Sequence, residues 1–541
     1  MTDDLRVTVP SDDTEFDGVV WPKPSSSLNF LGTLVSSESG ASPSFTSQRF
    51  RIAANVPSPA PGTMVVVITT TAQGEPCWQL ARVSNVWEVN PHEDAESSVL
   101  REVLPIRSEY ASEGTSTVIY RIAEIEPLEE AIFEGDQIRE IREAQTLPRA
   151  GSQVAYAPGN LVQGALGLES DPDRGIHIGH TRGEQRLPVT LNRSVIQRHI
   201  FICGGIGSGK SYTRGVLAEE LHALGVPQIN IDVNGEMIEA TEELGGINLV
   251  PGKAGFTLPL SALTPEDVTN AIPGVRSGTN IETLIQHAHG DLLRTRTLAS
   301  GEHFGVEDLI KHIDKVAPLL GMEAKGTLEP AKQRARSLER IPYIGEPYDW
   351  NNRINPGAII NIDCRKLLVS DLQLIVASIA RDLQRLAAKK DNRFVVFSID
   401  EFHLVAPNDD RSVTTQVLRE IARIGRHYKI GLILTTQSPQ DVDRAILKRL
   451  LTRFLHSIEP DQLDALRGVF SDASKDLIEQ LPKMPQGVCV VTGAFETIRH
   501  ATVVDIRERT TTHGGGTPDI WSDLHKPGWQ SMYNIKRAKR D

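Results

Sequence analysis

The sequence predicts an α/β fold, with a phosphate-loop core built on a parallel sheet, a small β domain before it and a helical insertion within it. Three observations lead to this fold class. Residues 204–211 fit the pattern G-x-x-x-x-G-K-S at the junction of an apolar strand and an amphipathic helix. Apolar strand-like runs alternate with helical segments after residue 166, which is typical of a parallel sheet with helices on both faces. Short β-like runs between Gly, Pro and Ser turns precede them, which favours a barrel or sandwich.

Length and composition indicate a multidomain protein. A chain of 541 residues exceeds what one hydrophobic core usually holds, so about three domains are expected. The net charge of -13 does not by itself suggest a nucleic-acid partner. The four cysteines are scattered without a C-x-x-C pair, which favours buried core residues in a reducing cytoplasm. Since no apolar run reaches the ~20 residues of a membrane helix, we expect a cytoplasmic protein without a membrane partner.

The amino-terminal part divides into an arm and a β-barrel domain. Residues 1–28 are rich in Ser, Pro and Asp, so we expect a flexible arm there. A compositional shift at about residue 166 marks the entry to the core. The barrel domain therefore spans residues 29–165, and its expected strands cover residues 30–36, 64–70, 78–89, 118–125 and 154–157.

The core is expected in two pieces, residues 166–262 and 349–505, followed by a tail at 506–541. The helical insertion between them spans residues 263–348, where Thr264 is a suitable N-cap for a helix that begins with Pro265. Its charge-rich segment could face phosphates, but a solvated helix surface is the favoured interpretation. The expected core strands cover residues 199–203, 228–232, 358–363, 394–400, 430–436 and 454–458.

The phosphate loop predicts that the protein binds ATP. Gly207 and Gly209 let the backbone turn successive N–H groups toward an anion. Lys210 places a point charge near the β- and γ-phosphates, and the Ser211 hydroxyl is suited to bind Mg²⁺. We therefore expect the nucleotide to be held by Gly205, Ile206, Gly207, Ser208, Gly209, Lys210, Ser211 and Tyr212.

An acidic pair completes the expected catalytic site. The apolar run 394–400 carries Asp400 and Glu401 to the carboxyl edge of the sheet, where doubly wound folds bind their ligands. Asp400 can then hold Mg²⁺ together with Ser211, and Glu401 can polarise the water that attacks the γ-phosphate. Gln437 follows the next strand and could sense or orient the γ-phosphate, with a capping or loop amide as the alternative.

Three arginines share one face of the helix before that next strand. Arg419, Arg423 and Arg426 are spaced i, i+4 and i+7. Such a stripe is usually solvated or paired with carboxylates. In a ring ATPase, however, one of these guanidinium groups could reach the neighbouring subunit's site and stabilise transition-state charge.

The order of these motifs resembles one family. The strings GGIGSGKS, IDVNGE, SIDEFHLVAP, RIGRHYKIGLILTTQSPQDVD, LTRFLHSI and RERTTTHGG are similar to those of the HerA helicases, in the HerA and FtsK group of DNA-pumping ATPases. The resemblance covers roughly residues 30–518. It implies a HerA-type amino-terminal barrel, a RecA-like core and a homo-hexameric ring around double-stranded DNA.

The resemblance also implies roles for single residues. Lys210, Ser211, Asp400, Glu401 and Gln437 take the roles given above. Arg426 matches the family's trans-acting arginine, Arg198 and Arg453 match basic positions near the nucleotide, and the tail with His513, Gly514 and Gly515 resembles a brace on the adjacent subunit. Two departures from the family are Ile206 in place of Thr and DVNGEM in place of DPHGEY, which leaves the roles of Asp232 and Glu236 open.

The implied function is an ATP-driven translocase or helicase on duplex DNA. It would work with an effector supplied in trans, a nuclease or a sirtuin-type NAD hydrolase that docks on the barrel, in phage defence or DNA end processing. One alternative is a hexameric scaffold or signalling ATPase that regulates an effector without moving along DNA. Another is a monomeric phosphate-loop kinase.

Overall fold

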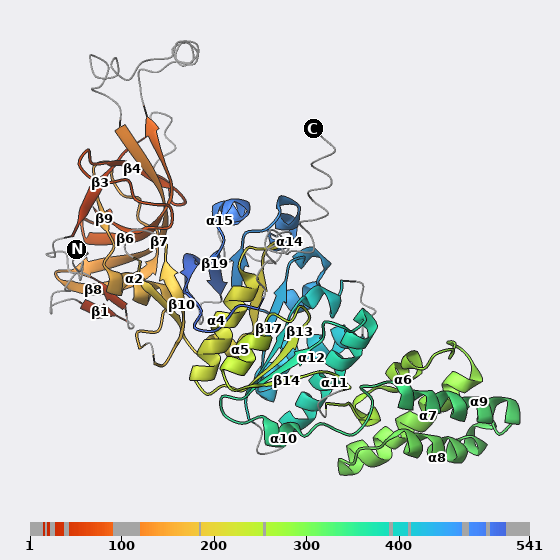
Figure 1. Cartoon of the computed structure of the whole chain (residues 1–541). Coiled ribbons are helices and arrows are strands. Elements are labelled where there is room, and N and C mark those ends of the chain that lie inside the picture. The colour runs from red at the N-terminus through yellow and green to blue at the C-terminus, as the bar shows by residue number, and fades with distance from the viewer. Residues whose placement is uncertain are drawn as a thin grey trace, which may run out of the picture.

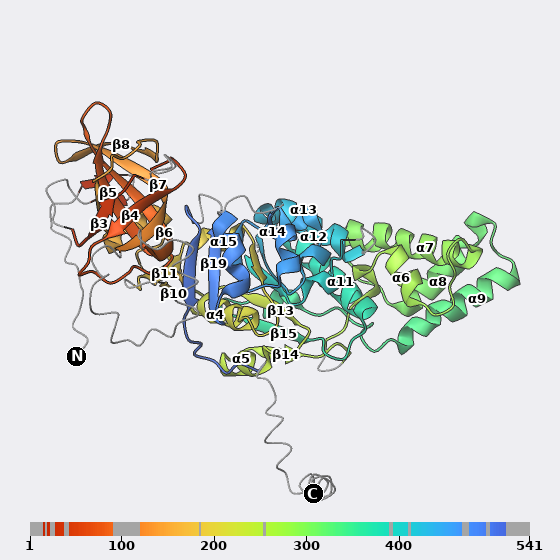
Figure 2. The ribbon, with the colours of Figure 1, turned by 90° about the horizontal axis from the view of Figure 1, so that it is seen from above.

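The chain folds into a β-barrel, an α/β core and a helical unit that lie side by side (Figure 1, Figure 2). The molecule is represented by a computed structural model. It describes residues 14–16, 19–21, 28–36, 43–89, 120–171, 173–182, 186–252, 256–388, 393–408, 413–467, 475–493 and 498–514. Most of the expected arm and the tail after residue 514 lie outside these residues.

The described part of the expected arm contains a short hairpin. Strands β1 (Thr14–Phe16) and β2 (Val19–Trp21) pair as an antiparallel hairpin. Trp21 is fully buried and belongs to the same apolar cluster as Trp78 of the barrel. Burial of an indole ring releases enough free energy to hold a short segment against the barrel, despite its polar composition.

The amino-terminal domain contains a closed six-stranded antiparallel barrel, as the β-like runs predict. Its strands follow the order β4-β3-β9-β5-β6-β7, and the pairing of β4 with β7 closes the ring. Strand β8 (Gln137–Glu143) extends β7 outside the ring, and helix α2 (Gly159–Leu166) packs its apolar face against the cluster that holds Trp21. The six strands are β3 (Phe30–Leu34), β4 (Gln48–Ile52), β5 (Met64–Thr70), β6 (Pro76–Val89), β7 (Tyr120–Glu134) and β9 (Gln153–Tyr156).

The core is an 11-stranded mixed sheet in the order β11-β10-β20-β19-β18-β12-β17-β16-β13-β15-β14. Its centre is parallel, as predicted, and consists of β12 (Ile200–Cys203), β13 (Gln228–Asp232), β14 (Ile247–Leu249), β15 (Ile359–Asp363), β16 (Val395–Ile399), β17 (Ile430–Thr436) and β18 (Thr452–His456). At one side the sheet continues beyond the predicted parallel strands. There an antiparallel flank is formed by β10 (Ile176–Thr181), β11 (Pro188–Leu191), β19 (Val488–Gly493) and β20 (Thr502–Ile506).

Helices cover both faces of this sheet. On one face, Ile202 of β12 packs with Leu217 of α4 (Lys210–Ala223). On the other, Phe201 belongs to the cluster formed with α11 (Val369–Ala387) and α12 (Val413–Tyr428). Four further short helices belong to the core, namely α3 (Ser194–Gln197), α5 (Ile238–Glu243), α13 (Arg444–Leu447) and α14 (Leu463–Arg467), and α15 (Lys475–Gln480) follows them. Alternate side chains of each central strand thus face different helix layers.

Helices fill the chain between β14 and β15. Helix α6 (Pro265–Ala271) begins with a capping box, in which the Thr264 hydroxyl accepts from the Asp267 N–H at 3.1 Å and Asp267 accepts from the Thr264 N–H at 2.8 Å. Helix α6 is followed by α7 (Asn280–Leu292), a π-helical turn (Leu293–Leu298), α8 (Val306–Val316), α9 (Lys325–Arg336) and α10 (Trp350–Arg353). The apolar faces of α6, α7, α8 and α9 form a core separate from that of the sheet.

Two further expectations concern the state of the cysteines and the presence of membrane-spanning helices. All four cysteines, Cys77, Cys203, Cys364 and Cys489, are free and buried. Among the described residues, no helix is both long enough and apolar enough to span a bilayer.

Candidate active site

The phosphate loop follows β12 and leads into α4 at the carboxyl edge of the parallel strands. Gly207 and Gly209 have φ angles of +74° and +112°, a region that side chains disfavour. The Lys210 ammonium donates to the Gly205 carbonyl at 3.0 Å, and the Gly205 N–H donates to the Ser457 carbonyl at 2.7 Å. The expected strand 454–458 lies instead at Thr452–His456.

A cavity of about 460 Å³ opens on this loop and is large enough for a nucleotide. Its inner wall is residues 205–208 of the phosphate loop. Two loops that border β18 and β19 form the outer wall, with Ser457, Ile458, Glu459, Pro460, Pro482, Met484 and Gln486. A glycine-lined cradle of this volume, at the loop that leads into Lys210 and Ser211, fits a nucleoside triphosphate.

Asp400 stands directly after β16, at the same edge as the phosphate loop. Its side chain is 2% exposed and lies 3.4 Å from the Nη1 atom of Arg214. Burial raises the pKa of Asp400, although the charge of Arg214 opposes the shift. A cation bound next to this carboxylate would favour its ionised form, so the site fits Mg²⁺ held by Asp400 and Ser211.

Glu401 has three properties of a catalytic base. Its backbone is left-handed, with φ 44° and ψ 51°, a strained conformation for a residue with a side chain. Its Oε2 atom is buried and has no hydrogen-bond partner among the described residues. Burial and the neighbouring charge of Asp400 raise the pKa of Glu401 to about 7, close to the range in which a general base works well.

Gln437 lies next to this acidic pair. It follows the last residue of β17, and β17 pairs in parallel with β16. The Gln437 N–H donates to the Glu401 carboxylate. The structure therefore places the Gln437 backbone at the catalytic edge, as expected, and its role toward the γ-phosphate stays a prediction.

Arg214 is a central residue of the site that was not predicted from the sequence. It is 2% exposed on α4, one turn after Lys210, and lies 3.3 Å from Asp232 and 3.4 Å from Asp400. Burial would lower the pKa of Arg214, but the charges of Asp400 and Asp232 raise it. Asp232 also accepts the N–H groups of residues 235–237 at 3.0–3.1 Å, so it caps this loop. The sequence signal that could have identified Arg214 is its i, i+4 spacing from Lys210, which places both side chains on one face of α4.

The described part of the carboxyl-terminal tail, residues 507–514, packs on α4 of its own chain, and the brace on an adjacent subunit stays a prediction. Arg507 pairs with Glu219 of α4 at 2.8 Å, and Thr511 donates its N–H and its hydroxyl to the same carboxylate at 2.9 and 2.7 Å. The Arg509 N–H donates to the Tyr212 hydroxyl at 2.7 Å. His513 lies against the Tyr212 ring, with ring centroids 5.9 Å apart, whereas Gly515 lies outside the described residues. The nearly buried Glu219 requires donors, and the tail of the same chain supplies them.

Three arginines expected at the nucleotide lie at the opposite edge of the sheet. Arg198 precedes β12, and Arg453 near the start of β18 is 6% exposed and donates its Nε–H to the Leu450 carbonyl at 2.9 Å. Arg426 lies in the last turn of α12, which leads into the start of β17. Four residues of β12 span about 13 Å at about 3.3 Å per residue. Arg198 and Arg453 therefore lie at the edge away from this chain's phosphate loop, and their place near a nucleotide stays a prediction.

The other two arginines of the stripe differ in surroundings. Arg419 forms a bidentate pair with Asp443, at 2.6 and 3.1 Å, and so anchors α13 to α12. Arg423 is exposed. The stripe therefore does not act as a unit, and Arg426, whose side chain is outside the described part, remains the candidate trans-acting arginine.

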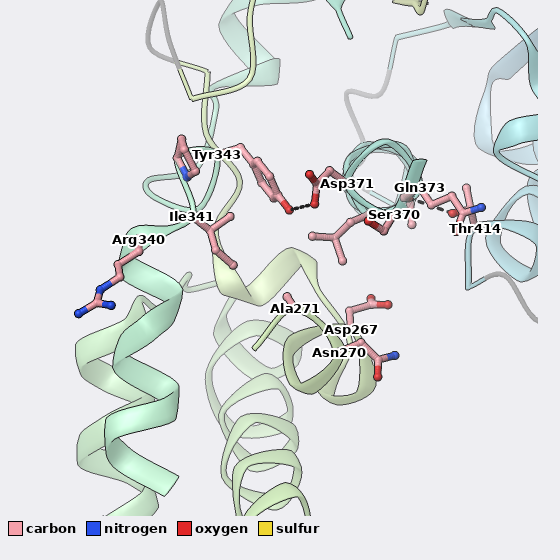
Figure 3. A pocket seen from close by; sticks show the side chains of 13 residues that line it. Asp267, Asn270, Ala271, Arg340, Ile341, Tyr343, Ser370, Asp371, Gln373 and Thr414 are labelled. Atoms are coloured by element: carbon pink, nitrogen blue, oxygen red, sulfur yellow. Dashed lines mark hydrogen bonds between the residues drawn. The ribbon is translucent and has the colours of Figure 1, made fainter. Parts of the chain in front are cut away.

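A second cavity, of about 560 Å³, lies away from the phosphate loop, between α6, the segment after α9, and the starts of α11 and α12 (Figure 3). The Tyr343 hydroxyl donates to Asp371 across it at 2.7 Å. Gln373 lines this cavity and also donates to the Leu404 carbonyl at 2.8 Å, three residues after Glu401. The joint between the helical unit and the core is thus tied to the catalytic loop.

Comparisons with known proteins agree with this geometry. Residues 176–383 match the family model described as "Helicase HerA, central domain", and residues 352–459 match "ATPase family associated with various cellular activities (AAA)". The DNA double-strand break repair helicase HerA of Sulfolobus acidocaldarius is 24% identical over 366 residues, covering 64% of this chain and 72% of that protein. The protein of the same description from Sulfurisphaera tokodaii is 23% identical over 373 residues, covering 65% and 73%. A structure of VirB4 of Thermoanaerobacter pseudethanolicus aligns with a TM-score of 0.49 at 16% identity, covering 63% of this chain and 98% of that one.

Proposed function

We propose, from the premise that this chain is a HerA-type P-loop ATPase and hydrolyses ATP, that it works as a homo-hexameric ring that moves double-stranded DNA. The observation that carries this proposal is the separation of the catalytic groups within one subunit. Lys210, Asp400 and Glu401 lie at the carboxyl edge of the parallel strands, whereas Arg198 and Arg426 lie at the amino edge. A subunit can therefore offer these arginines only to the nucleotide of a neighbour, and head-to-tail contacts form a ring where the rotation between subunits closes.

The charges at the two edges support such head-to-tail contacts. Carboxylates stand at the ends of three neighbouring parallel strands, namely Asp232, Asp363 and Asp400. Cations stand shortly before the starts of five, namely Arg198, Arg353, Arg393, Lys429 and Arg449. Asp232 and Asp400 are buried beside Arg214, so it is the basic edge that offers charge to acidic groups or phosphates of the next subunit.

Within the shared site, each group has one task. The phosphate loop binds the triphosphate through its N–H groups and Lys210, and Ser211 and Asp400 hold Mg²⁺, which neutralises charge on the phosphates. Glu401 orients and deprotonates the attacking water. The arginine of the next subunit stabilises the charge that develops on the transferred phosphoryl group.

Duplex DNA is the proposed track. The relatives at 23–24% identity are described as double-strand break repair helicases. A ring that grips the phosphate backbone moves without regard to sequence, and its hold weakens as salt rises because the contacts displace counterions.

We further propose that an effector, a nuclease or a NAD hydrolase, docks on the barrel, in phage defence or DNA end processing. The barrel has its own core and exposes apolar side chains, with Phe30 45%, Phe45 59% and Leu147 48% exposed. Large apolar side chains at a surface are frequent anchors of protein partners.

The decisive test measures ATP hydrolysis with and without duplex DNA and scores displacement of a protein block on that duplex. The translocase proposal predicts stimulation by duplex DNA, loss of stimulation at high salt, and displacement of the block. Unstimulated hydrolysis without displacement would instead identify a scaffold or signalling ATPase.

A further inference from the structure

His403 lies between Glu401, the proposed catalytic base, and the end of the neighbouring strand β17. It belongs to the short 3₁₀ turn η5 (Phe402–Leu404) that follows Glu401, and its side chain is 17% exposed. Its Nδ1 atom lies 3.0 Å from the Thr436 hydroxyl oxygen and 3.4 Å from Glu401 Oε2. One ring nitrogen thus has two oxygens within reach.

The surroundings fix both the ring and its proton. The turn is anchored from the other side by Gln373, which donates to the Leu404 carbonyl at 2.8 Å. Burial lowers the pKa of His403, so the ring is neutral and carries one proton. Because Nδ1 faces a hydroxyl oxygen and a carboxylate oxygen, this proton is most stable on Nδ1.

Thr436 is the last residue of β17 and is fully buried. Its hydroxyl oxygen also accepts the Ser438 N–H at 3.1 Å, so it ties His403 to the strand end that carries Gln437. The Gln437 N–H in turn donates to Glu401. Two links therefore join the end of β17 to Glu401, one direct and one through His403.

We propose that His403 is a positioning residue whose Nδ1–H can turn to either of two acceptors, Thr436 or Glu401, and that its bond to Thr436 keeps Glu401 Oε2 available for the attacking water. When the end of β17 moves so that the distance between His403 Nδ1 and the Thr436 hydroxyl increases, the Nδ1–H donates to Glu401 Oε2 instead. That bond makes the carboxylate a weaker base, because hydrogen bonding to the charged form stabilises it. The inference rests on the proposed role of Glu401 in water activation.

The test compares Thr436→Val with Thr436→Ser in the full chain. Valine keeps the shape but removes the acceptor, so His403 turns to Glu401 and kcat falls by about tenfold, a fraction of the usual contribution of a general base. Serine keeps the acceptor and retains most of kcat. The affinity for a non-hydrolysable ATP analogue changes by less than about twofold in both variants, since His403 acts on water activation and not on phosphate binding.

The second arm removes the competing donor. In Thr436→Val combined with His403→Phe, Oε2 is free again, and kcat recovers to above that of Thr436→Val alone. A crystal structure of Thr436→Val should show His403 Nδ1 within about 3.0 Å of Glu401 Oε2. Unchanged kcat in Thr436→Val, or a double variant no faster than it, would overturn the inference. Normal turnover of Glu401→Gln would instead refute the proposed function on which it rests.

Discussion

At the scale of single residues, the account depends on groups held in unfavourable states. Glu401 has a strained backbone and a buried oxygen without a partner among the described residues, and Asp400 is buried beside one arginine. A left-handed side-chain-bearing residue costs on the order of 1–3 kcal/mol, and such costs concentrate at functional sites. The cost of holding the acidic pair in this state favours the catalytic role proposed for it.

Glu401→Gln and Lys210→Ala should separate hydrolysis from binding. Glutamine keeps the shape but cannot accept the proton, so turnover falls by about 10²–10⁴-fold while ATP remains bound. Alanine at 210 removes the charge that faces the phosphates, so affinity itself falls. Equilibrium binding of labelled ATP, measured next to phosphate release, distinguishes the two losses. Normal turnover by Glu401→Gln would contradict the assigned role.

The acid limb of the pH profile should report Glu401. Its pKa of about 7 lies above the ordinary value, so the carboxylate is protonated and inactive below pH 7 and ionised above it. kcat/KM, which reflects the free enzyme, should therefore rise with pH through a midpoint near 7. In the complex, bound Mg²⁺ favours the ionised carboxylate, so the limb of kcat should lie at lower pH. A kcat/KM midpoint at the ordinary value of 4.5 would contradict this interpretation.

At the scale of elements, the features that could be predicted are those encoded by residues adjacent in the sequence. The phosphate loop, the strand that ends in Asp400 and the capped helix at Thr264 all depend on short contiguous patterns. The Arg214 pairs and the folded-back tail depend on residues far apart in the chain, so local patterns did not reveal them. The antiparallel flank was not predicted, since no expected strand covered β10, β11, β19 or β20, and the pairing that joins them to the sheet links residues far apart in the chain.

Glu219→Ala should release the tail from α4. Glu219 accepts from Arg507, Thr510 and Thr511, and it is 5% exposed, so its loss leaves several donors unpaired. The expected destabilisation is on the order of 3 kcal/mol. Thermal melting of the full chain, with and without ATP, measures it.

Glu243→Ala is the matched control for this prediction. Glu243 also accepts from the tail, through Thr512, but it lies at the exposed surface, where water replaces the lost bond. Its melting temperature should stay near that of the unmodified chain. Equal melting temperatures for the two variants would show that the tail does not stabilise α4.

At the scale of the whole molecule, the parallel sheet separates two halves of one reaction. One edge carries the phosphate loop and the acids, and the other carries the arginines. The sequence predicted both sets of residues, but only the topology shows that they lie on opposite edges, since Arg198 and Lys210 are close in sequence. The proposed mechanism therefore requires a neighbour to complete each site.

Mixing two inactive variants tests this dependence most directly. Arg426→Ala keeps an intact phosphate loop but lacks the arginine for its neighbour, and Lys210→Ala has the opposite defect. Where the two meet in a mixed ring, one interface combines the intact Lys210 of one subunit with the intact Arg426 of the other. The account predicts that each variant alone is nearly inactive and that the mixture recovers part of the ATP hydrolysis. No recovery at any mixing ratio, or full activity of an isolated subunit, would contradict it.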